Sequence, residues 1–340
     1  MSEESLPHGR RNIATLTHPG NQDNAGRADA TPRRTAVRTV TVAREHAGRR
    51  LDNFLQGEIK GAPRGLVYKL LRSGQVRVNG SRAKPDYRLA AGDAVRIPPV
   101  EDTQGPVRIP PARVVAFEDM VRYEDARFLV VDKPAGLACH GGSGIRYGLI
   151  EVARAARPQA ARLDLAHRLD RDTSGCLVLC KDVETLRAVN TAIRERSAVK
   201  RYTALLCGRL APDTRVIEAE LEIARDAQGE RRSSVGGAGK PARTLLEGIE
   251  PVGQHSLVEL RLETGRMHQI RAHAQHLGHP VAGDRLYGAA HCNRQLAAYG
   301  LERLFLHASH VALSTPFGAI DVHAPLPAEL TAVLTRLRTP

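Results

Sequence analysis

The pattern of apolar and polar positions divides the 340-residue chain into four segments. Residues 1–38 are rich in Asn, Asp, Gly, Pro, Thr and Arg without apolar periodicity, so we expect a disordered tail. Apolar residues recur at helix and strand spacings over residues 39–99 and again over 119–335. The Pro-rich residues 100–118 lie between them. The sequence therefore predicts two domains joined by a semi-rigid linker.

The first domain begins with two apolar stripes of helical spacing. They consist of Leu51, Phe54, Leu55 and Ile59, and of Leu66, Val67, Leu70 and Leu71. Short alternating segments follow, separated by the turn sequences Asn79-Gly80 and Gly92-Asp93. We predict two short helices followed by a small sheet, which together bury only a small core.

The second domain mixes predicted strands and helices. Residues 128–131 and 176–180 are continuous apolar runs of strand length, and residues 259–263 alternate between apolar and polar. Apolar stripes predict helices over residues 184–197 and 267–277. This domain is therefore expected to contain both kinds of element around one core.

One polar segment of the second domain is dense in charge. The run His167-Arg168-Leu169-Asp170-Arg171-Asp172 carries five ionisable side chains and leads into the apolar residues 176–180. A polar loop held by a buried strand is a common support for a site. Asp170 and Asp172 would share a face if this part is extended, and at least one guanidinium is expected to be free for an anion or a base. The alternative is an internally neutralised turn.

Net charge indicates the class of partner. The chain has 50 Lys and Arg against 37 Asp and Glu, a formal charge of +13, which favours polyanions and above all nucleic acid. Its sequence has no run approaching 18 apolar residues, and the acidic start is not a secretory or transit signal. We therefore expect a soluble cytosolic protein without a membrane partner.

Much of this charge lies in the first domain. Residues 41–100 carry 12 Lys or Arg and five acids, which is +7 of the total. The candidates for RNA binding crowd the second helix and the hairpin after it: Arg64, Lys69, Arg72, Arg77, Arg82 and Lys84. An ordinary basic surface is the alternative, but this density favours phosphate contacts, which supply affinity and register rather than sequence readout.

Cysteines and histidines do not predict a metal site. The five cysteines are odd in number and their spacing predicts no disulfide framework, so Cys176 and Cys180 are expected to be buried thiols. His268, His273 and His276 suggest zinc, but the His-Glu-x-x-His pattern and a cysteine partner are both missing. Structural or RNA-facing histidines are favoured, and we expect neither a metal nor an organic cofactor.

The segment from His167 to Gly175 resembles the catalytic motif of the pseudouridine synthases of the large ribosomal-subunit group. The run Thr264-Gly265-Arg266-Met267-His268-Gln269-Ile270-Arg271 resembles a second signature of that family, and residues 283–288 and 304–308 also match. Residues 48–98 resemble the S-four-type RNA-binding domain. The resemblance implies an α+β fold: a small N-terminal S-four-type RNA-binding domain plus a pseudouridine synthase catalytic domain built on a mixed, mainly antiparallel sheet flanked by helices.

The same resemblance implies roles for single residues. Asp170 is expected to be catalytic, and Arg271 is expected to pair with it and keep it ionised. Tyr202 would pack on the target base, and Ile270 would add an apolar wall. Arg168 would enter the space that is left when the uridine swings out of the RNA.

The implied reaction is isomerisation of specific uridines in 23S ribosomal RNA, or its precursor, to pseudouridine by a cytoplasmic monomer. No redox or phosphate-transfer step occurs, so no cofactor is required. Lys133, in a Lys-Pro-x-Gly stretch that lines the cleft in family members, is a further candidate. Two alternatives stay open: Asp170 and Asp172 as the carboxylates of a glycosidase or the metal ligands of a nuclease, and a non-catalytic RNA-binding factor.

Overall fold

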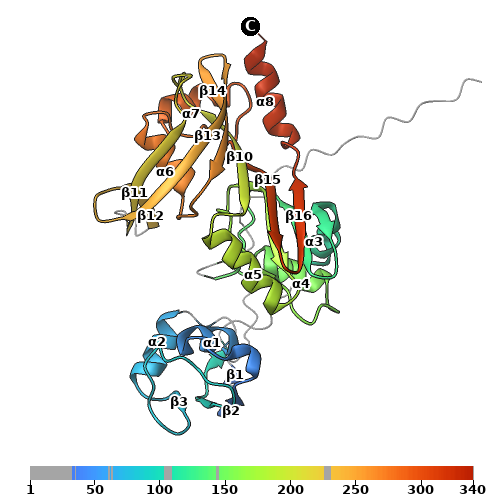
Figure 1. The fold of residues 1–340 in the computed structure, drawn as a ribbon, viewed down its shortest axis with the longest axis vertical. Helices are drawn as coiled ribbons and strands as arrows, with labels where there is room; N and C mark the ends of the chain where they lie inside the picture. The colour runs from blue at the N-terminus through green and yellow to red at the C-terminus, as the bar shows by residue number, and fades with distance from the viewer. Residues whose placement is uncertain are drawn as a thin grey trace, which may run out of the picture. The chain divides into compact units, whose positions relative to one another are not determined.

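The computed structural model describes residues 33–34, 36–59, 62, 64–102, 109–142, 145–225 and 231–339. The chain forms two compact units that divide between Gly105 and Pro106 (Figure 1). Most of the predicted disordered tail lies outside the described residues; within it, β1 (Arg33–Arg34) pairs with β5 (Glu101–Asp102). No helix among the described residues has the length and apolar character needed to cross a membrane.

The first unit contains the two predicted helices and a small sheet. Its helices are α1 (Leu51–Glu58) and α2 (Arg64–Arg72), and its sheet has the order β2 (Arg38–Thr41), β4 (Ala94–Ile97), β3 (Arg77–Val78). The two apolar stripes meet in one core, in which Leu51, Phe54 and Leu55 are almost completely buried. Most of the charged side chains lie on the outside of this unit, although Asp52 and Asp93 are buried.

The second unit is organised on a sheet in which the described residues form eleven strands. The strands are β6 (Val121–Glu124), β7 (Phe128–Lys133), β8 (Asp164–Leu165), β9 (Ser174–Cys180), β10 (Val199–Leu206), β11 (Val216–Arg225), β12 (Arg231–Val235), β13 (Lys240–Val252), β14 (His255–Leu262), β15 (Leu306–Thr315) and β16 (Gly318–His323). Their order is β12-β11-β13-β14-β10-β15-β9-β7-β6, with β16 beside β15 and β8 beside β9. Strands β9 and β15 run parallel, and the other pairs are antiparallel. The mixed, mainly antiparallel sheet is thus confirmed.

Helices lie along both halves of this sheet (Figure 1). They are α3 (Pro111–Val115), α4 (Leu149–Ala156), α5 (Val183–Arg194), α6 (Gln269–His276), α7 (Ala290–Ala297) and α8 (Ala328–Arg338). Helix α5 contacts β9 and β15, whereas α6 contacts β11, β12 and β13. Helix α3 and the fully buried Phe117 fall within the predicted linker 100–118. The later part of that segment therefore belongs to the second unit, because Phe117 joins its core.

The parallel contact between β9 and β15 requires a glycine at position 175. Gly175 has a φ of +111°, and a Cβ there would clash with the carbonyl oxygen of Ala308 in β15. Glycine removes both obstacles, so the two strands can approach closely. This contact fixes the start of β9 and therefore the end of the charged loop that precedes it.

The expectation about the cysteines is wrong for one pair. Cys207, which follows β10, forms a disulfide bond with Cys292 in α7, 85 positions further along the chain. The spacing of the cysteines along the sequence does not indicate this disulfide, because only tertiary folding brings the two segments together. Cys176 and Cys180 are free and buried, as predicted, and burial raises the pKa of each thiol to about 12.

Candidate active site around Asp170

Asp170 lies in the loop between β8 and β9, and both of its neighbours are held by buried side chains. On one side, the N–H of Leu169 donates to Sγ of Cys139 (3.3 Å), and that thiol donates back to the carbonyl oxygen of Leu169 (3.1 Å). On the other side, Nζ of Lys133 donates to the carbonyl oxygen of Arg171 (3.0 Å). The loop therefore presents the Asp170 carboxylate from a constrained backbone.

Lys133 is a fully buried lysine whose ammonium group is satisfied by backbone oxygens. Besides Arg171, it donates to the carbonyl oxygens of Pro134 and Leu137, both at 2.9 Å. Three acceptors match the three protons of an ammonium group. Burial lowers the pKa of Lys133 to about 8. This residue ties the Lys-Pro-x-Gly turn to the loop of Asp170, so it supports the site rather than reaching into it.

Arg271 approaches Asp170 from helix α6. Its Nη1 lies 3.4 Å from Oδ2 of Asp170, so the structure brings together the two residues that the sequence paired. The Arg271 side chain is 9% exposed, and that of Asp170 is 26% exposed. A guanidinium at this distance stabilises the negative charge of the carboxylate, which a ligand can still reach.

A second carboxylate, Asp284, fixes the direction of Arg271. Its oxygens accept from Nε (2.7 Å) and Nη2 (2.8 Å) of Arg271, which leaves Nη1 for Asp170. Asp284 is fully buried, and its Oδ1 also accepts from the N–H groups of Leu286 and Tyr287. Burial opposes its ionisation, but Arg271 and these N–H groups outweigh burial and lower the pKa of Asp284.

Sequence reasoning missed the role of Asp284. It lies in residues 283–288, which match the family, but no periodicity or motif connects it with Arg271. The ring of Tyr287 in the same stretch lies 4.9 Å from the Arg271 guanidinium, which adds a cation–π contact. Asp284 and Tyr287 both lie in residues 283–288, and the match of this short stretch to the family was the one sign in the sequence that it belongs to the site.

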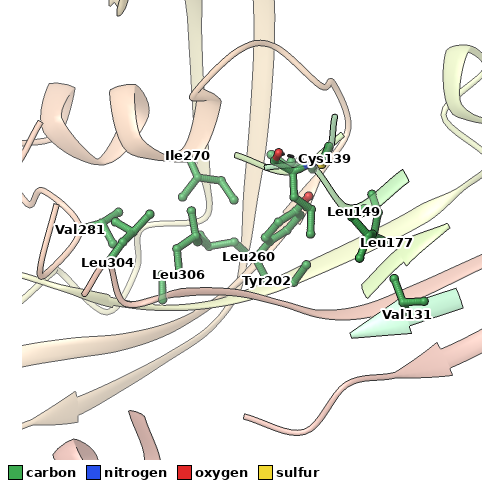
Figure 2. Close-up of a cluster of buried hydrophobic side chains, with 14 of the residues drawn as sticks. Val131, Cys139, Leu149, Leu177, Tyr202, Leu260, Ile270, Val281, Leu304 and Leu306 are labelled. Carbon is green, nitrogen blue, oxygen red and sulfur yellow. Dashed lines mark hydrogen bonds between the residues drawn. The ribbon is translucent and has the colours of Figure 1, made fainter. Parts of the chain in front are cut away.

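Tyr202 and Ile270 are the two buried residues expected to form the apolar side of the site. Both belong to the main core of the second unit, and Figure 2 shows Tyr202 beside Leu260, with Ile270 on the adjacent helix. Tyr202 is 6% exposed. Burial, followed by the charge of Asp170, raises the pKa of its hydroxyl, which therefore stays protonated at neutral pH. Tyr202 thus lies within electrostatic reach of the carboxylate, and Ile270 directly precedes Arg271 in α6.

Asp172 and Arg168, two other charged residues of the motif, do not pair with Asp170 among the described residues. Asp172 is 46% exposed and accepts from Nε of Arg171 (3.1 Å), so it does not add a second carboxylate beside Asp170. This placement argues against a paired-carboxylate glycosidase or a two-aspartate metal site. Arg168 is exposed, and the described part of the chain offers it no hydrogen-bond or ion-pair partner. It is free to meet a ligand.

The three histidines that suggested zinc have different surroundings. His273 is fully buried, and its Nδ1 is hydrogen-bonded to the hydroxyl of Thr244 (3.0 Å). His276 is exposed. His268 has Nε2 at 3.8 Å from Oδ1 of Asp170. Only His268 is therefore part of the site.

Three potential metal ligands do come together elsewhere in the described residues, at His310, Asp321 and His323. His310 donates from Nε2 to Asp321 (2.7 Å), and the guanidinium of Arg201 donates to its Nδ1 (3.1 Å). This arrangement satisfies His310 on both nitrogens and places a positive charge against it. A further cation is therefore disfavoured at this cluster.

The basic candidates of the first unit are mostly exposed. Two shallow hollows occur there, one lined by Gly65, Lys69, Arg72 and Ser73, and the other by residues that include Arg82, Lys84 and Tyr87. Within the described residues, Lys69, Arg72, Arg82 and Lys84 have no carboxylate partner. Arg77 is half-buried and donates to the carbonyl oxygen of Gly80 (3.3 Å), whereas the side chain of Arg64 lies outside the described residues.

Both units match known families. Residues 127–276 match the RNA pseudouridylate synthase family, and residues 49–95 match the S4 domain. The first match runs from β7 to α6, so it includes Asp170, Tyr202 and Arg271. The second covers both helices of the first unit.

Similar proteins cover nearly the whole chain. It is 41% identical over 312 residues to ribosomal large subunit pseudouridine synthase C of Vibrio cholerae, covering 90% of this chain and 98% of that protein. The Escherichia coli protein of the same name is 42% identical over 310 residues, covering 89% and 97%. The solved structure of human RNA pseudouridylate synthase domain containing 4 aligns with a TM-score of 0.56 and 25% identity, covering 67% of this chain and 96% of that one.

Proposed function

The chain belongs to the family of ribosomal large subunit pseudouridine synthase C, and we propose that it isomerises specific uridines of 23S ribosomal RNA to pseudouridine, with Asp170 as the catalytic residue. The assignment of the site rests on one observation. A partly exposed carboxylate, Asp170, lies 3.4 Å from a guanidinium that a buried carboxylate holds in place.

The reaction breaks the bond from ribose to a ring nitrogen and forms a bond from ribose to carbon 5. It therefore needs a poised carboxylate, a surface that holds the detached base and a way to remove the proton from carbon 5. Asp170 supplies the carboxylate and acts on the nucleoside as nucleophile or base. Arg271 stabilises its charge, and Asp284 prevents Arg271 from turning away.

The apolar residues hold the base. Tyr202 packs on the uracil, and Ile270 closes the other side. The proton that leaves carbon 5 passes to a base, for which the Asp170 carboxylate is available, while the protonated hydroxyl of Tyr202 can donate its hydrogen to a ring nitrogen. Arg168, which is exposed and unpaired among the described residues, enters the space that the uridine leaves in the RNA. Extrusion costs a few kcal/mol, and least for a base in a loop.

The S4 domain supplies affinity for ribosomal RNA through phosphate contacts. The proposed contacts are Arg64, Lys69, Arg72, Arg77, Arg82 and Lys84. One chain provides every residue of the proposed site, which supports action as a monomer. A ribosomal RNA substrate, or its precursor, supports a cytoplasmic location.

The direct test replaces Asp170 with Asn and measures release of the carbon-5 hydrogen from uridine in transcribed 23S RNA. We expect turnover to fall by more than about 100-fold, because the variant has no group that can act on the nucleoside. RNA affinity should be retained. Asp172→Asn, which changes an exposed carboxylate in the same loop, is the matched control and should remain active. Near wild-type turnover of Asp170→Asn would refute the proposal and favour a non-catalytic RNA-binding protein.

A further inference from the structure

His268 lies beside Asp170 and has no role in the mechanism above. It precedes helix α6 with φ 52° and ψ 26°, the left-handed region that residues other than glycine rarely adopt. Its side chain is 18% exposed, and Nε2 lies 3.8 Å from Oδ1 of Asp170. Sparsely populated backbone conformations persist only where the surrounding structure imposes them, and they cluster at functional sites.

The next residue, Gln269, imposes this conformation. Its side chain is buried, and its Oε1 accepts from the N–H of Arg266 (3.0 Å) and the hydroxyl of Thr264 (2.8 Å). Its Nε2 donates to two acceptors on β13, both at 3.0 Å. Four hydrogen bonds therefore fix the turn in which His268 lies, and the imidazole has a defined position beside the carboxylate.

A chain of hydrogen bonds favours one position for the proton on the neutral ring of His268. The N–H of Ser233 donates to the hydroxyl oxygen of Tyr287 (2.7 Å), and the same oxygen lies 3.0 Å from Nδ1 of His268. The N–H of Ser233 can only donate, and among the described residues Nδ1 of His268 is the acceptor within reach of the Tyr287 hydroxyl hydrogen, so this hydrogen is best satisfied by pointing at Nδ1. Nδ1 then accepts, and the neutral imidazole carries its proton on Nε2. Nε2 is the nitrogen that faces Asp170.

Burial supports the neutral form. It lowers the pKa of His268, and the nearby Arg271 and Arg168 act in the same direction, whereas Asp170 and Asp284 oppose it. The rings of His268 and Tyr287 also meet edge to face, with centroids 5.6 Å apart. Packing therefore holds the ring in place, burial favours its neutral form, and the hydrogen bond from Tyr287 favours the tautomer with the proton on Nε2.

The Asp170 carboxylate is thus approached by a donor on each oxygen. Arg271 lies 3.4 Å from Oδ2, and His268 lies 3.8 Å from Oδ1. Both distances are longer than a good hydrogen bond, as is common at catalytic groups before the substrate arrives. Two donors on opposite oxygens would stop the carboxylate from rotating and aim its remaining lone pairs at one position.

We propose that His268 is a positioning residue that orients Asp170 through Nε2–H, with Tyr287 fixing the required tautomer. This inference rests on the proposed function, because it gives His268 a role only through Asp170. The donor acts together with Arg271, which holds the other oxygen, and the two interactions tighten when uridine fills the site.

The test compares two amides at position 268. His268→Asn tolerates the left-handed backbone and places a polar group near Nδ1, but it removes the donor at Nε2. His268→Gln returns an N–H close to the position of Nε2. At saturating RNA we expect kcat of His268→Asn to fall by roughly 10-fold to 100-fold with unchanged RNA affinity, and His268→Gln to recover most of it. His276→Asn, on the exposed side of the same helix, should keep wild-type kcat.

Wild-type kcat in His268→Asn overturns the inference. So does a His268→Gln enzyme that is folded and as slow as His268→Asn, because the donor would then not be the relevant group. If Asp170→Asn is inactive but His268→Asn keeps wild-type kcat, only the role of His268 is refuted, and the proposed function stands. An active Asp170→Asn enzyme refutes both.

A measurement on the wild-type protein does not depend on variant folding. Nitrogen NMR of the histidine rings distinguishes the two neutral tautomers. We expect a protonated Nε2 and an unprotonated Nδ1 at His268 at neutral pH. A ring protonated on Nδ1 alone would overturn the inference, since no hydrogen would then point at Asp170.

Discussion

Basic side chains serve different purposes in the two units. In the second unit, Arg271 is buried and bonded to Asp284 through two nitrogens, so its third donor has one direction. In the first unit, Lys69 and Arg72 are exposed and lack a carboxylate partner among the described residues. A buried, paired guanidinium orients a reactive group, whereas exposed, unpaired charges attract phosphates. Turnover should therefore depend on the exact geometry of the second unit. RNA affinity should depend on the number of positive charges on the first unit.

The largest effect is expected from Asp284→Asn, which removes the charge opposite Arg271 with almost no change in size. Arg271 would keep only the more distant Asp170 carboxylate, at 3.4 Å, as a partner for its buried charge. We expect the free energy of unfolding of the second unit to fall by about 3–5 kcal/mol. Turnover should also fall, because Arg271 is no longer held toward Asp170. Hydrogen exchange of peptides from α6 in the full chain measures the change in stability.

A surface ion pair provides the matched control for this acid-to-amide change. Glu250 accepts from Arg338 at 2.7 Å, but the two side chains are 54% and 49% exposed. Glu250→Gln is expected to cost less than about 1 kcal/mol, since water already screens the pair. Equal destabilisation by Asp284→Asn and Glu250→Gln would contradict the distinction between buried and exposed charges.

Acid should weaken the second unit through His273. Burial lowers the pKa of this histidine to about 4, below its ordinary value of 6.5. Between these values the unfolded chain binds the proton more readily than the folded chain, so stability falls as the pH decreases through this range. His273 alone contributes about 2 kcal/mol to the decrease in stability between pH 7 and pH 5, and His167, whose pKa burial lowers to about 3, adds to it. Urea unfolding at the two pH values measures it.

His273→Asn is the control for this prediction. Asn retains a polar group near Nδ1 for the hydroxyl of Thr244 and does not titrate in this range. The variant should therefore show a smaller decrease in stability between pH 7 and pH 5 than the wild-type protein. An unchanged decrease would mean that other groups dominate the acid response of the second unit.

The smallest effects per residue are expected in the first unit. Replacing Lys69, Arg72, Arg82 or Lys84 with Ala should lower the slope of log affinity against log salt by about 0.7 for each phosphate of single-stranded RNA that the variant no longer binds. The value of kcat at saturating RNA should not change. Arg38→Ala is the control, because Glu58 already pairs with that guanidinium (2.9 Å). A fall in kcat without a change in slope would contradict the division of tasks between the two units.

Local patterns were enough to predict many of the elements. The apolar run at residues 176–180 became the fully buried strand β9, and the stripes around Phe54 and Leu70 became α1 and α2. In each case neighbouring residues decide the outcome, because the period of the apolar side chains matches one geometry. The helix predicted over residues 267–277 begins at Gln269 instead, since His268 is held in the left-handed region.

The sequence predicted those residues of the candidate site that lie in a recognisable motif. The sequence indicated Asp170 and Arg271, and the structure brings them together. It also indicated Asp170 and Asp172 as a possible pair, but the loop turns Asp172 outward to Arg171. Spacing along the chain could not show which of these neighbours shares the site, because a loop does not follow the regular geometry of a strand.

By itself, the sequence determined the two-part organisation, several of the helices and strands, the excess of positive charge and the carboxylate around which the proposed site is built. These properties depend on residue type and short-range spacing. Tertiary structure alone decided that Asp284 holds Arg271, that Lys133 and Cys139 constrain the loop of Asp170, and that Cys207 meets Cys292. Such interactions join distant segments at distances of a few ångströms, and only the packing of the sheet and its helices sets those distances.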